Sequence, residues 1–562
     1  MTAANLAQYL VFLAIVAGLV KPLGVYMAHV FSDEPVWLDG LLKPVERAIY
    51  RTIRINPDAD MPWHEYATAF VVLGSVGTLL LYAMLRAQRV LPGFDPHVLT
   101  TPVTPDLAFN TAISFATTTT WQAYAGETTM SYVTQMVGLV TQNFIAGAAG
   151  LAVGIAFIRG IARNASNTLG NFWVDVVRAV LYVLLPLSLL TAIVLVWQGV
   201  PMNWSSYTHA TTLGGVVQTI AQGPVVALET IKNLGTNGGG FFNANGAHPY
   251  ENPTPFTNLL ELLSITVLPA ALTYTFGRLT RRPRDGWLLF GVMTALFTVG
   301  LAVAQVAEQR GTPAVAPNME GKEVRFGVAG SVLGAVTTSN GATGSYNAMH
   351  DSFTPIGGAV PLVNMLLGET IYGGLGTGLI SLVMVGLLGL FLTGLMIGRS
   401  PEYFGKGIGP PEMTMLMLYT IVAPVTILGL VAIAVITPAG LAGLTTNTGV
   451  HGFTEIVVAY ASAFANNGQS FAGLNANTPF YNITLAIAML LGRFGLVIPA
   501  LALAGRLSRI TARDRLPGTF PTDSLLFGGV VVGTLLIVGA LTFLPTLTLG
   551  PLTEQLAMLR HR

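Results

Sequence analysis

The sequence predicts an all-α protein that crosses a lipid bilayer about ten times. Its 562 residues are 52% hydrophobic and only 9% charged, whereas about 25% of the residues of a typical soluble domain are charged. The chain also contains about ten apolar stretches of the roughly 20 residues that a helix needs to cross the hydrocarbon core. A net charge of +1 argues against a nucleic-acid partner, and the absence of cysteine excludes disulfides, thiolate metal sites and a cysteine nucleophile.

The apolar stretches define the expected spans. The first has no basic flank and no Ala-x-Ala cleavage site, so we expect it to be retained as a span rather than removed as a signal peptide. In chain order the spans are residues 5–27, 66–86, 131–158, 174–197, 258–278, 286–306, 368–397, 413–437, 480–504 and 525–545.

Basic side chains gather in alternate connections between the spans. By the positive-inside rule these five connections are cytoplasmic, which puts both termini on the extracellular or periplasmic side. The residues concerned are Lys43, Arg47, Arg51 and Arg54; Arg159 and Arg163; Arg278, Arg281, Arg282 and Arg284; Arg399 and Lys406; and Arg506, Arg509, Arg513 and Arg515.

The remaining long connections share a second pattern, a short apolar piece followed by a strip rich in Gly, Thr or Asn. The pieces Leu107–Ala116, Pro224–Leu234, Phe326–Thr338 and Phe453–Ala465 are too short to cross the bilayer but suit helices that enter and turn back. With Thr118, Gly238, Gly344 and Gly468 as markers, the pattern recurs after 120, 106 and 124 residues, which indicates a fourfold internal repeat. We therefore divide the chain into a first span with its loop (1–65), four span, re-entrant helix and span repeats (66–158, 173–278, 285–397 and 412–504) and a last span (525–545).

The four strips have the composition of an ion pathway. Irregular backbone at membrane depth is tolerated only inside protein or beside a water-filled cavity. A dehydrated monovalent cation needs neutral oxygens, which carbonyl, Thr and Asn groups supply, and glycine allows the positive φ angles that turn carbonyls the same way. Close helix packing is the alternative explanation for the glycines, but four equivalent strips favour a filter. The candidate ion-binding residues are Thr118, Thr119, Thr120, Thr236, Asn237, Gly238, Gly239, Thr343, Gly344, Asn466, Asn467 and Gly468.

Two further features are candidates for a gate. Gly373, Gly374, Gly376 and Gly378 interrupt the apolar run 368–397, where glycine weakens a helix, although close packing of helices would also explain them. Arg493 lies within another apolar run, where a buried charge costs at least a few kcal/mol. It is either an electrostatic barrier below the filter or one half of an ion pair with a carboxylate, and both interpretations stay open.

Other charged residues have simpler interpretations. Asp175 and Arg178 are three residues apart on one span, which predicts an intrahelical ion pair. Glu251, His248 and Asp351 lie in the outer loops, where we expect them to stabilise the vestibule rather than to coordinate a metal. No spacing resembles a zinc site.

The string Leu-Gly-Thr-Asn-Gly-Gly-Gly-Phe-Phe-Asn-Ala-Asn-Gly-Ala-His-Pro-Tyr-Glu-Asn-Pro at residues 234–253 resembles the signature of the KdpA family, the channel-like subunits of bacterial potassium-transporting P-type ATPases. Further strings resemble that family in the same order, so the resemblance covers essentially the whole chain. They are Asn-Met-Glu-Gly-Lys-Glu from Asn318, Met-His-Asp-Ser-Phe from Met349, Gly-Leu-Met-Ile-Gly-Arg-Ser-Pro-Glu-Tyr from Gly394, Gly-Leu-Asn-Ala-Asn from Gly473 and Gly-Arg-Phe-Gly from Gly492.

This resemblance implies four membrane-pore-membrane units around a selectivity filter for K⁺. It implies a bacterial inner-membrane complex with a P-type ATPase subunit (KdpB), an accessory subunit (KdpC) and a small peptide (KdpF). It also implies a broken-helix gate at the glycines after Tyr372. Two strips depart from the family pattern. The first is a run of four threonines where relatives alternate Thr and Asn, and the third has Thr343 where relatives carry Cys, which leaves its register open. We expect both changes to alter affinity rather than the ion. The filter positions carried over are Thr118, Thr236, Gly238, Thr343, Gly344, Asn466 and Gly468.

Two functions of different classes fit these observations. One is a non-catalytic ion-binding subunit of a primary pump, and the other is a stand-alone transporter or channel of the Trk, Ktr or HKT kind. The sequence contains no Gly-x4-Gly-Lys-[Ser/Thr] loop, no Asp-Lys-Thr-Gly-type string and no soluble segment long enough for a nucleotide domain. We therefore assign no catalytic residue and no cofactor to this chain. The family strings favour the pump subunit, and a lipid-modifying enzyme is a distant third.

Overall fold

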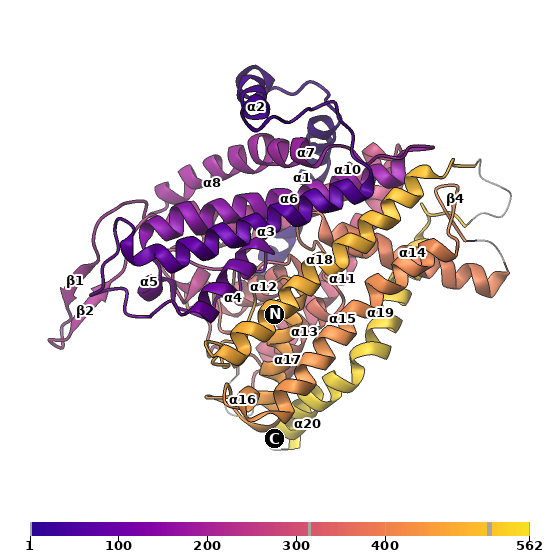
Figure 1. Cartoon of the computed structure of the whole chain (residues 1–562). Helices are drawn as coiled ribbons and strands as arrows, with labels where there is room; N and C mark the ends of the chain where they lie inside the picture. The colour runs from indigo at the N-terminus through magenta and orange to yellow at the C-terminus, as the bar shows by residue number, and fades with distance from the viewer. Residues whose placement is uncertain (1–2, 313–315, 399–400, 514–519, 561–562) are drawn as a thin grey trace.

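The computed structural model describes residues 3–312, 316–398, 401–513 and 520–560, and long helices dominate it (Figure 1). Among the described residues ten helical stretches are long and apolar enough to cross a membrane, which confirms the predicted number of spans. Their helices are α1 (Ala3–Phe31), α3 (Trp63–Ala87), η2 with α6 (Thr134–Val140, Thr141–Ala162), α7, η3 and α8 (Phe172–Arg178, Ala179–Leu184, Leu185–Trp197), α10 (Pro255–Leu279), α11 (Pro283–Arg310), α14 (Thr377–Ile397), α15 (Pro410–Ile436), α18 (Pro479–Arg509), and α19, η6 and α20 (Leu525–Leu547, Thr548–Leu552, Thr553–Arg560).

Four shorter helices confirm the predicted re-entrant pieces. They contain between 10 and 17 residues and are largely buried. At about 1.5 Å per residue, the longest reaches about 26 Å, less than the roughly 30 Å of a bilayer core. These helices are α4 (Pro105–Ala116), α9 (Val225–Leu234), α12 (Gly327–Asn340) and α17 (Gly449–Ala465).

The remaining elements are short and lie in the connections. Two antiparallel hairpins are the named sheets of the described part of the chain, with Thr208 paired to Ile220 in one and Glu402 to Gly407 in the other. The elements are α2 (Asp39–Ile53), η1 (Gln88–Val90), α5 (Gly126–Thr129), β1 (Thr208–Thr211), β2 (Val217–Ile220), η4 (Asn245–Ala247), η5 (His350–Ser352), α13 (Pro355–Leu366), β3 (Glu402–Tyr403), β4 (Lys406–Gly407) and α16 (Pro438–Leu441).

The seventh span begins later than its hydropathy predicts. The expected start was residue 368, but α14 begins at Thr377 and residues 367–376 form a non-helical loop after α13. Positive φ angles at Gly368, Glu369, Tyr372 and Gly376 are the reason, because they break the regular helical ladder. We call residues 367–376 the intramembrane loop.

The five basic connections lie together at one end of the helices. The backbone N–H of Ser166 donates to Ser508 and that of Arg513 to Gly405, at 2.9 and 3.0 Å. Further contacts join Met61 to Gly170 and Arg282 to Phe404. Figure 1 shows β4 at this end of the long helices and α16 and α20 at the opposite end. We call these ends the basic side and the opposite side; Arg399 and Arg515 lie outside the described residues.

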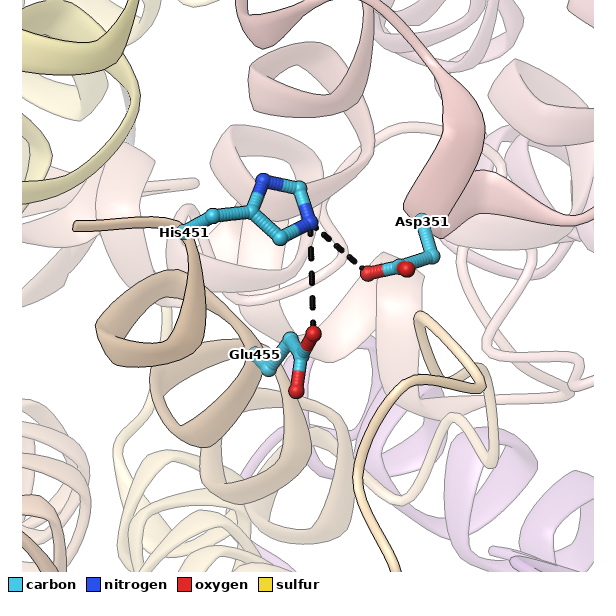
Figure 2. A group of neighbouring side chains, drawn as sticks. All are labelled: Asp351, His451 and Glu455. Carbon is cyan, nitrogen blue, oxygen red and sulfur yellow. Dashed lines mark hydrogen bonds and ion pairs between the residues drawn. The ribbon is translucent and has the colours of Figure 1, made fainter. Parts of the chain in front are cut away.

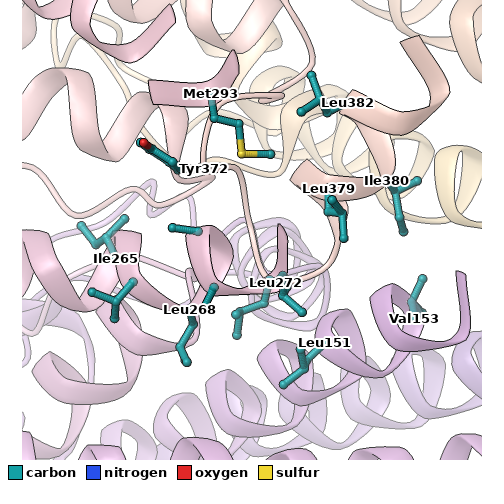
Figure 3. Close-up of a cluster of buried hydrophobic side chains, with 14 of the residues drawn as sticks. Leu151, Val153, Ile265, Leu268, Leu272, Met293, Tyr372, Leu379, Ile380 and Leu382 are labelled. Atoms are coloured by element: carbon teal, nitrogen blue, oxygen red, sulfur yellow. The ribbon is translucent and has the colours of Figure 1, made fainter. Parts of the chain in front are cut away.

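The core forms where α6, α10, α11 and α14 meet. Leu151, Leu268, Met293 and Leu379, one from each helix, are at most 2% exposed and belong to the same buried cluster as the intramembrane loop residue Tyr372 (Figure 3). This apolar packing fixes the helices that surround the four strips.

The predicted intrahelical pair of Asp175 and Arg178 is wrong. The carboxylate of Asp175 is buried against α6, where it binds Arg159 at 2.6 Å, while Arg178 binds Glu46 of α2 at 2.9 Å. Each side chain is instead paired with an oppositely charged residue from another part of the chain.

Candidate ion-binding site

The four strips meet around one centre, and neighbouring strips touch through their backbones. Gly238 of the second strip and Gly344 of the third form a parallel β-bridge. A Cβ on Gly238 would lie 2.6 Å from the Cα of Gly344, and a Cβ on Gly344 would lie 2.7 Å from the carbonyl carbon of Gly468 in the fourth strip. Both contacts are too close for any side chain, so glycine is required at these positions.

The first strip closes the ring with hydroxyl and carbonyl groups. A Cβ on Gly468 would collide with the carbonyl oxygen of Thr119. On its other side, the hydroxyl of Thr120 donates to the carbonyl of Asn237, and Gln122 exchanges two hydrogen bonds with the backbone of Gly240 at 2.8 and 3.1 Å. The strips therefore contact one another in the cyclic order one, two, three, four.

Backbone angles fix the register of the strips. The first left-handed residue after each re-entrant helix is Thr118, Thr236, Ala342 or Asn466, with φ between 48° and 63°. By this pattern Thr118 is equivalent to Thr236, and Thr120 is equivalent to Gly238. The use of Thr118 as the first-strip counterpart of Gly238 in the fourfold repeat was therefore wrong by two residues. The bridge between Gly238 and Gly344 fixes the register of the third strip, in which Thr343 is equivalent to Asn237.

The N–H groups of the strips point back to their own re-entrant helices. Those of Asn237 and Gly238 donate to the carbonyl of Lys232 at 2.9 Å, and that of Thr343 donates to Thr338 at 3.2 Å. In the other two strips Asn467 donates to Ser462 and Thr120 to Ser114, both at 3.0 Å. These five donors are therefore not available to the centre, which favours backbone carbonyls as the polar groups there.

The amides of the fourth strip bind neighbouring segments. Asn466 donates to the hydroxyl of Thr119 at 2.9 Å, and Asn467 donates at 2.8 Å to the buried carboxylate of Glu369 in the intramembrane loop. These two side chains hold the fourth strip against the first strip and against the loop below it.

A buried polar cluster that the sequence interpretation missed supports the second strip. The amide of Asn245 donates to the carbonyls of Gly239 and Gly344, at 2.6 and 3.1 Å, and accepts from the ammonium of Lys232 at 2.8 Å. Lys232 also binds Glu229 and Glu251, which lie entirely within the protein. The sequence feature that could have revealed this cluster is Lys232, a charged residue inside an apolar re-entrant helix, because the same reasoning singled out Arg493.

A cavity of about 60 Å³ lies against the re-entrant helix ends of the strips. This volume exceeds the about 10–15 Å³ that one water requires. The cavity lining includes Thr118, Thr236, Ala342 and Asn466, one residue from each strip, together with Glu369, Gly374 and Arg493.

The candidate gate glycines lie directly below the strips. The N–H of Leu375 donates to the hydroxyl of Thr236 at 2.9 Å, and a Cβ on Gly374 would lie 2.9 Å from that of Ala342. Gly376 packs against Gly154 of α6, and Gly373 and Gly378 are in contact with each other. The loop thus covers the cavity end of the second and third strips.

Arg493 faces the same cavity without a carboxylate partner. Its guanidinium donates to the carbonyl of Ala146 at 3.0 Å and lies 5.4 Å from the ring centre of Phe70. Among the described residues no carboxylate lies within ion-pair distance, so the ion-pair interpretation is wrong for this structure.

In the non-basic connections, Glu251 and Asp351 link separate segments. Glu251 binds Lys232, Asp351 binds His451 at 2.8 Å, and His248 stacks on Phe242. These contacts agree with the expected role in stabilising the loops.

Comparison with known proteins gives one consistent result. The model of the family described as KdpA, potassium-transporting ATPase A subunit, matches residues 10–556. Proteins named potassium-transporting ATPase potassium-binding subunit are similar to the chain. Those of Methylobacterium nodulans and Methylorubrum extorquens are 51% and 52% identical over 99% of this chain and 98% of their own length, and that of Solibacter usitatus is 50% identical over the whole of both. The crystal structure of the potassium transporter TrkH from Vibrio parahaemolyticus is similar in fold, with a TM-score of 0.51, 14% identity and coverage of 88% of this chain and 97% of that one.

Proposed function

This chain belongs to the KdpA family of potassium-transporting ATPase A subunits, and from this membership we propose that it binds and translocates K⁺ within an ATP-driven uptake complex. The closed ring of four strips, whose N–H groups face outward, is the observation that carries the proposal. Such a ring offers a cation neutral carbonyl and hydroxyl oxygens in place of its hydration shell. The C-terminal ends of four re-entrant helices add partial negative charge nearby.

Below the ring, the proposed path is closed in two ways. The intramembrane loop covers the cavity side of the second and third strips, and Glu369 holds it against Asn467. Arg493 places a positive charge beside the cavity and raises the barrier for K⁺ moving along the axis. A pump subunit needs this closure, because passive flow would dissipate the gradient that ATP hydrolysis builds.

The energy source lies in another chain in this proposal. The partner that hydrolyses ATP is a P-type ATPase subunit (KdpB), accompanied by KdpC and the small peptide KdpF, in the bacterial inner membrane with both termini outside. This chain contributes no catalytic residue. Family membership favours this function over that of a stand-alone Trk, Ktr or HKT-like transporter, although the fold of this chain is similar to that of TrkH.

The test is K⁺-stimulated ATP hydrolysis by the purified complex containing Gly344→Ala. Because a Cβ there meets the backbone of Gly468, we expect a higher K⁺ concentration for half-maximal stimulation. Gly291→Ala is the matched control, since a Cβ on this residue of α11 has open space. Unchanged K⁺ dependence in an assembled Gly344→Ala complex would contradict the assignment of the ring as the binding site.

A further inference from the structure

A group of three metal-ligating side chains lies away from the ring. Asp351 comes from η5, while His451 and Glu455 lie one helical turn apart at the N-terminal end of α17 (Figure 2). The imidazole Nε2 lies 2.8 Å from a carboxylate oxygen of Asp351 and 4.0 Å from one of Glu455. All three potential ligand atoms lie within 4.8 Å of one another.

A fourth residue orients the imidazole. Nδ1 of His451 lies 2.8 Å from Glu554 on α20, so its N–H donates to that carboxylate and leaves Nε2 toward Asp351 and Glu455. Metal-binding histidines in proteins are usually held in this way, with the second ring nitrogen bonded to a carboxylate that fixes the tautomer and the ring orientation.

The two oxygens of Glu455 differ in their surroundings, and Oε1 is the one that faces His451. This residue is 1% exposed, its Oε1 accepts from Asn447 at 2.7 Å, and its Oε2 has no hydrogen-bond partner. The same Asn447 amide also bonds Asp351 at 3.0 Å, so two carboxylates converge on one neutral group. In the metal-free group the imidazolium of His451 lies between these carboxylates, and a divalent cation can take the place of its Nε2 proton because both carboxylates converge there.

We propose that Asp351, His451 and Glu455 form a binding site for a divalent transition-metal ion, with Zn²⁺ as the probe. One imidazole nitrogen with two carboxylates is a ligand set that suits Zn²⁺ and Mn²⁺. It suits Mg²⁺ and Ca²⁺ less well, because these ions prefer shells made of oxygen alone. Bonds of about 2.0–2.2 Å put tetrahedral ligands about 3.3 Å apart, between the 2.8 and 4.0 Å separations of this group. The ion replaces a proton on Nε2, which leaves to solvent, and water completes the coordination because His451 is 21% exposed.

The site would join three distant parts of the chain. Through Glu554 it fixes α20, through Asp351 it fixes the connection after the third strip, and α17 leads directly into the fourth strip at Asn466. Its existence does not depend on the proposed K⁺ function, because none of its residues belongs to the ring.

The experiment measures Zn²⁺ binding by the purified complex after chelator treatment, using calorimetry and metal analysis. We expect His451→Asn and Glu455→Gln each to remove one Zn²⁺ per copy of this chain. Glu554→Gln, which keeps the three ligands, should weaken binding by about 10- to 100-fold. His209→Asn is the control, since His209 is an exposed histidine on β1, and it should bind as the wild type does.

Two results would overturn the proposal. One is the absence of Zn²⁺ binding by the wild-type complex at micromolar concentration, which would leave His451 as a protonated clamp between carboxylates. The other is equal stoichiometry and affinity in the wild type and Glu455→Gln. Thermal unfolding of each variant complex without metal verifies that a lost site does not reflect lost assembly.

Discussion

Replacing Gly238 should damage K⁺ selection without preventing assembly of the complex. The residue has φ of 86° and bridges to Gly344, so the second and third strips meet where it has no side chain. Gly238→Ala adds only a methyl group, and Gly238→Asp adds a carboxylate where selectivity needs neutral dipoles. We expect loss of high-affinity K⁺ uptake and weaker discrimination among monovalent cations, with the larger loss in the Asp variant.

The magnitude follows from the contact at Gly238. Its Cβ would collide with the backbone nitrogen of Gly344 and lie 2.6 Å from the Cα of that residue, whereas ordinary contact begins at 3.4 Å, so the strips must separate by at least about 0.8 Å. A left-handed φ costs a residue with a side chain about 1–2 kcal/mol. If the closed, ion-bound ring carries this strain, K⁺ affinity falls by about 5- to 30-fold in Gly238→Ala.

The assay is ATP hydrolysis by the reconstituted complex, titrated with K⁺, Rb⁺ and Na⁺. Gly291→Ala is the control for the methyl group and Gly40→Asp, on the exposed surface of α2, for the charge. A glycine in a loop far from the strips is not automatically a suitable control. Gly311, for example, caps α11 at φ 64° and ψ −157°, a conformation essentially restricted to glycine. Wild-type affinity and selectivity in an assembled Gly238→Asp complex would refute the reasoning.

Four further predictions address topology, energy source and stability. A reporter in 281–284 should be cytoplasmic and one in 311–317, which includes the undescribed residues 313–315, external; the reverse would overturn the topology. The purified chain alone should hydrolyse no ATP, and measurable turnover would contradict the pump-subunit assignment. Asp175→Asn breaks a buried ion pair, so thermal unfolding should show about 3–5 kcal/mol of lost stability, against at most about 1 kcal/mol for Asp60→Asn in an exposed pair. Hydrogen bonds to Asp351 and Glu554 raise the pKa of His451 from 6.5 to about 10. In the metal-free protein, protonated His451 therefore contributes its full stabilisation of α20 below about pH 6.5, and this contribution is lost as the pH rises toward 10. The protection of α20 amides, measured as the exchange rate relative to the base-catalysed intrinsic rate at each pH, should fall along that rise, and equal protection at about pH 6.5 and about pH 10 would contradict it.

Features that depend on local composition were predictable from the sequence. The number of spans and the four re-entrant helices follow from the length and polarity of each stretch, which hydropathy measures directly. The same measure placed the start of the seventh span wrongly at residue 368. Hydropathy reports composition and not backbone angles, and most of the intramembrane loop is buried like a helix although its φ angles differ.

Features that depend on tertiary neighbours were not predictable in the same way. The i, i+3 spacing of Asp175 and Arg178 indicated a pair, but α6 and α2 supplied closer partners. Thr118 was aligned with Gly238 because a run of four threonines carries no mark of register, and only the backbone angles separate Thr118 from Thr120. Asn245 was missed because its contacts with two strips arise from a loop that folds back over them.

A single polypeptide supplies all four quarters of the ring, and this has a consequence for experiments on it. Thr119, Asn237, Thr343 and Asn467 occupy equivalent places, yet they are not identical. In a channel assembled from identical subunits, one substitution changes every quarter simultaneously. Here each quarter can be altered separately, so four single substitutions would divide the ion's stabilisation among the four sides and reveal whether it sits centrally or toward one of them.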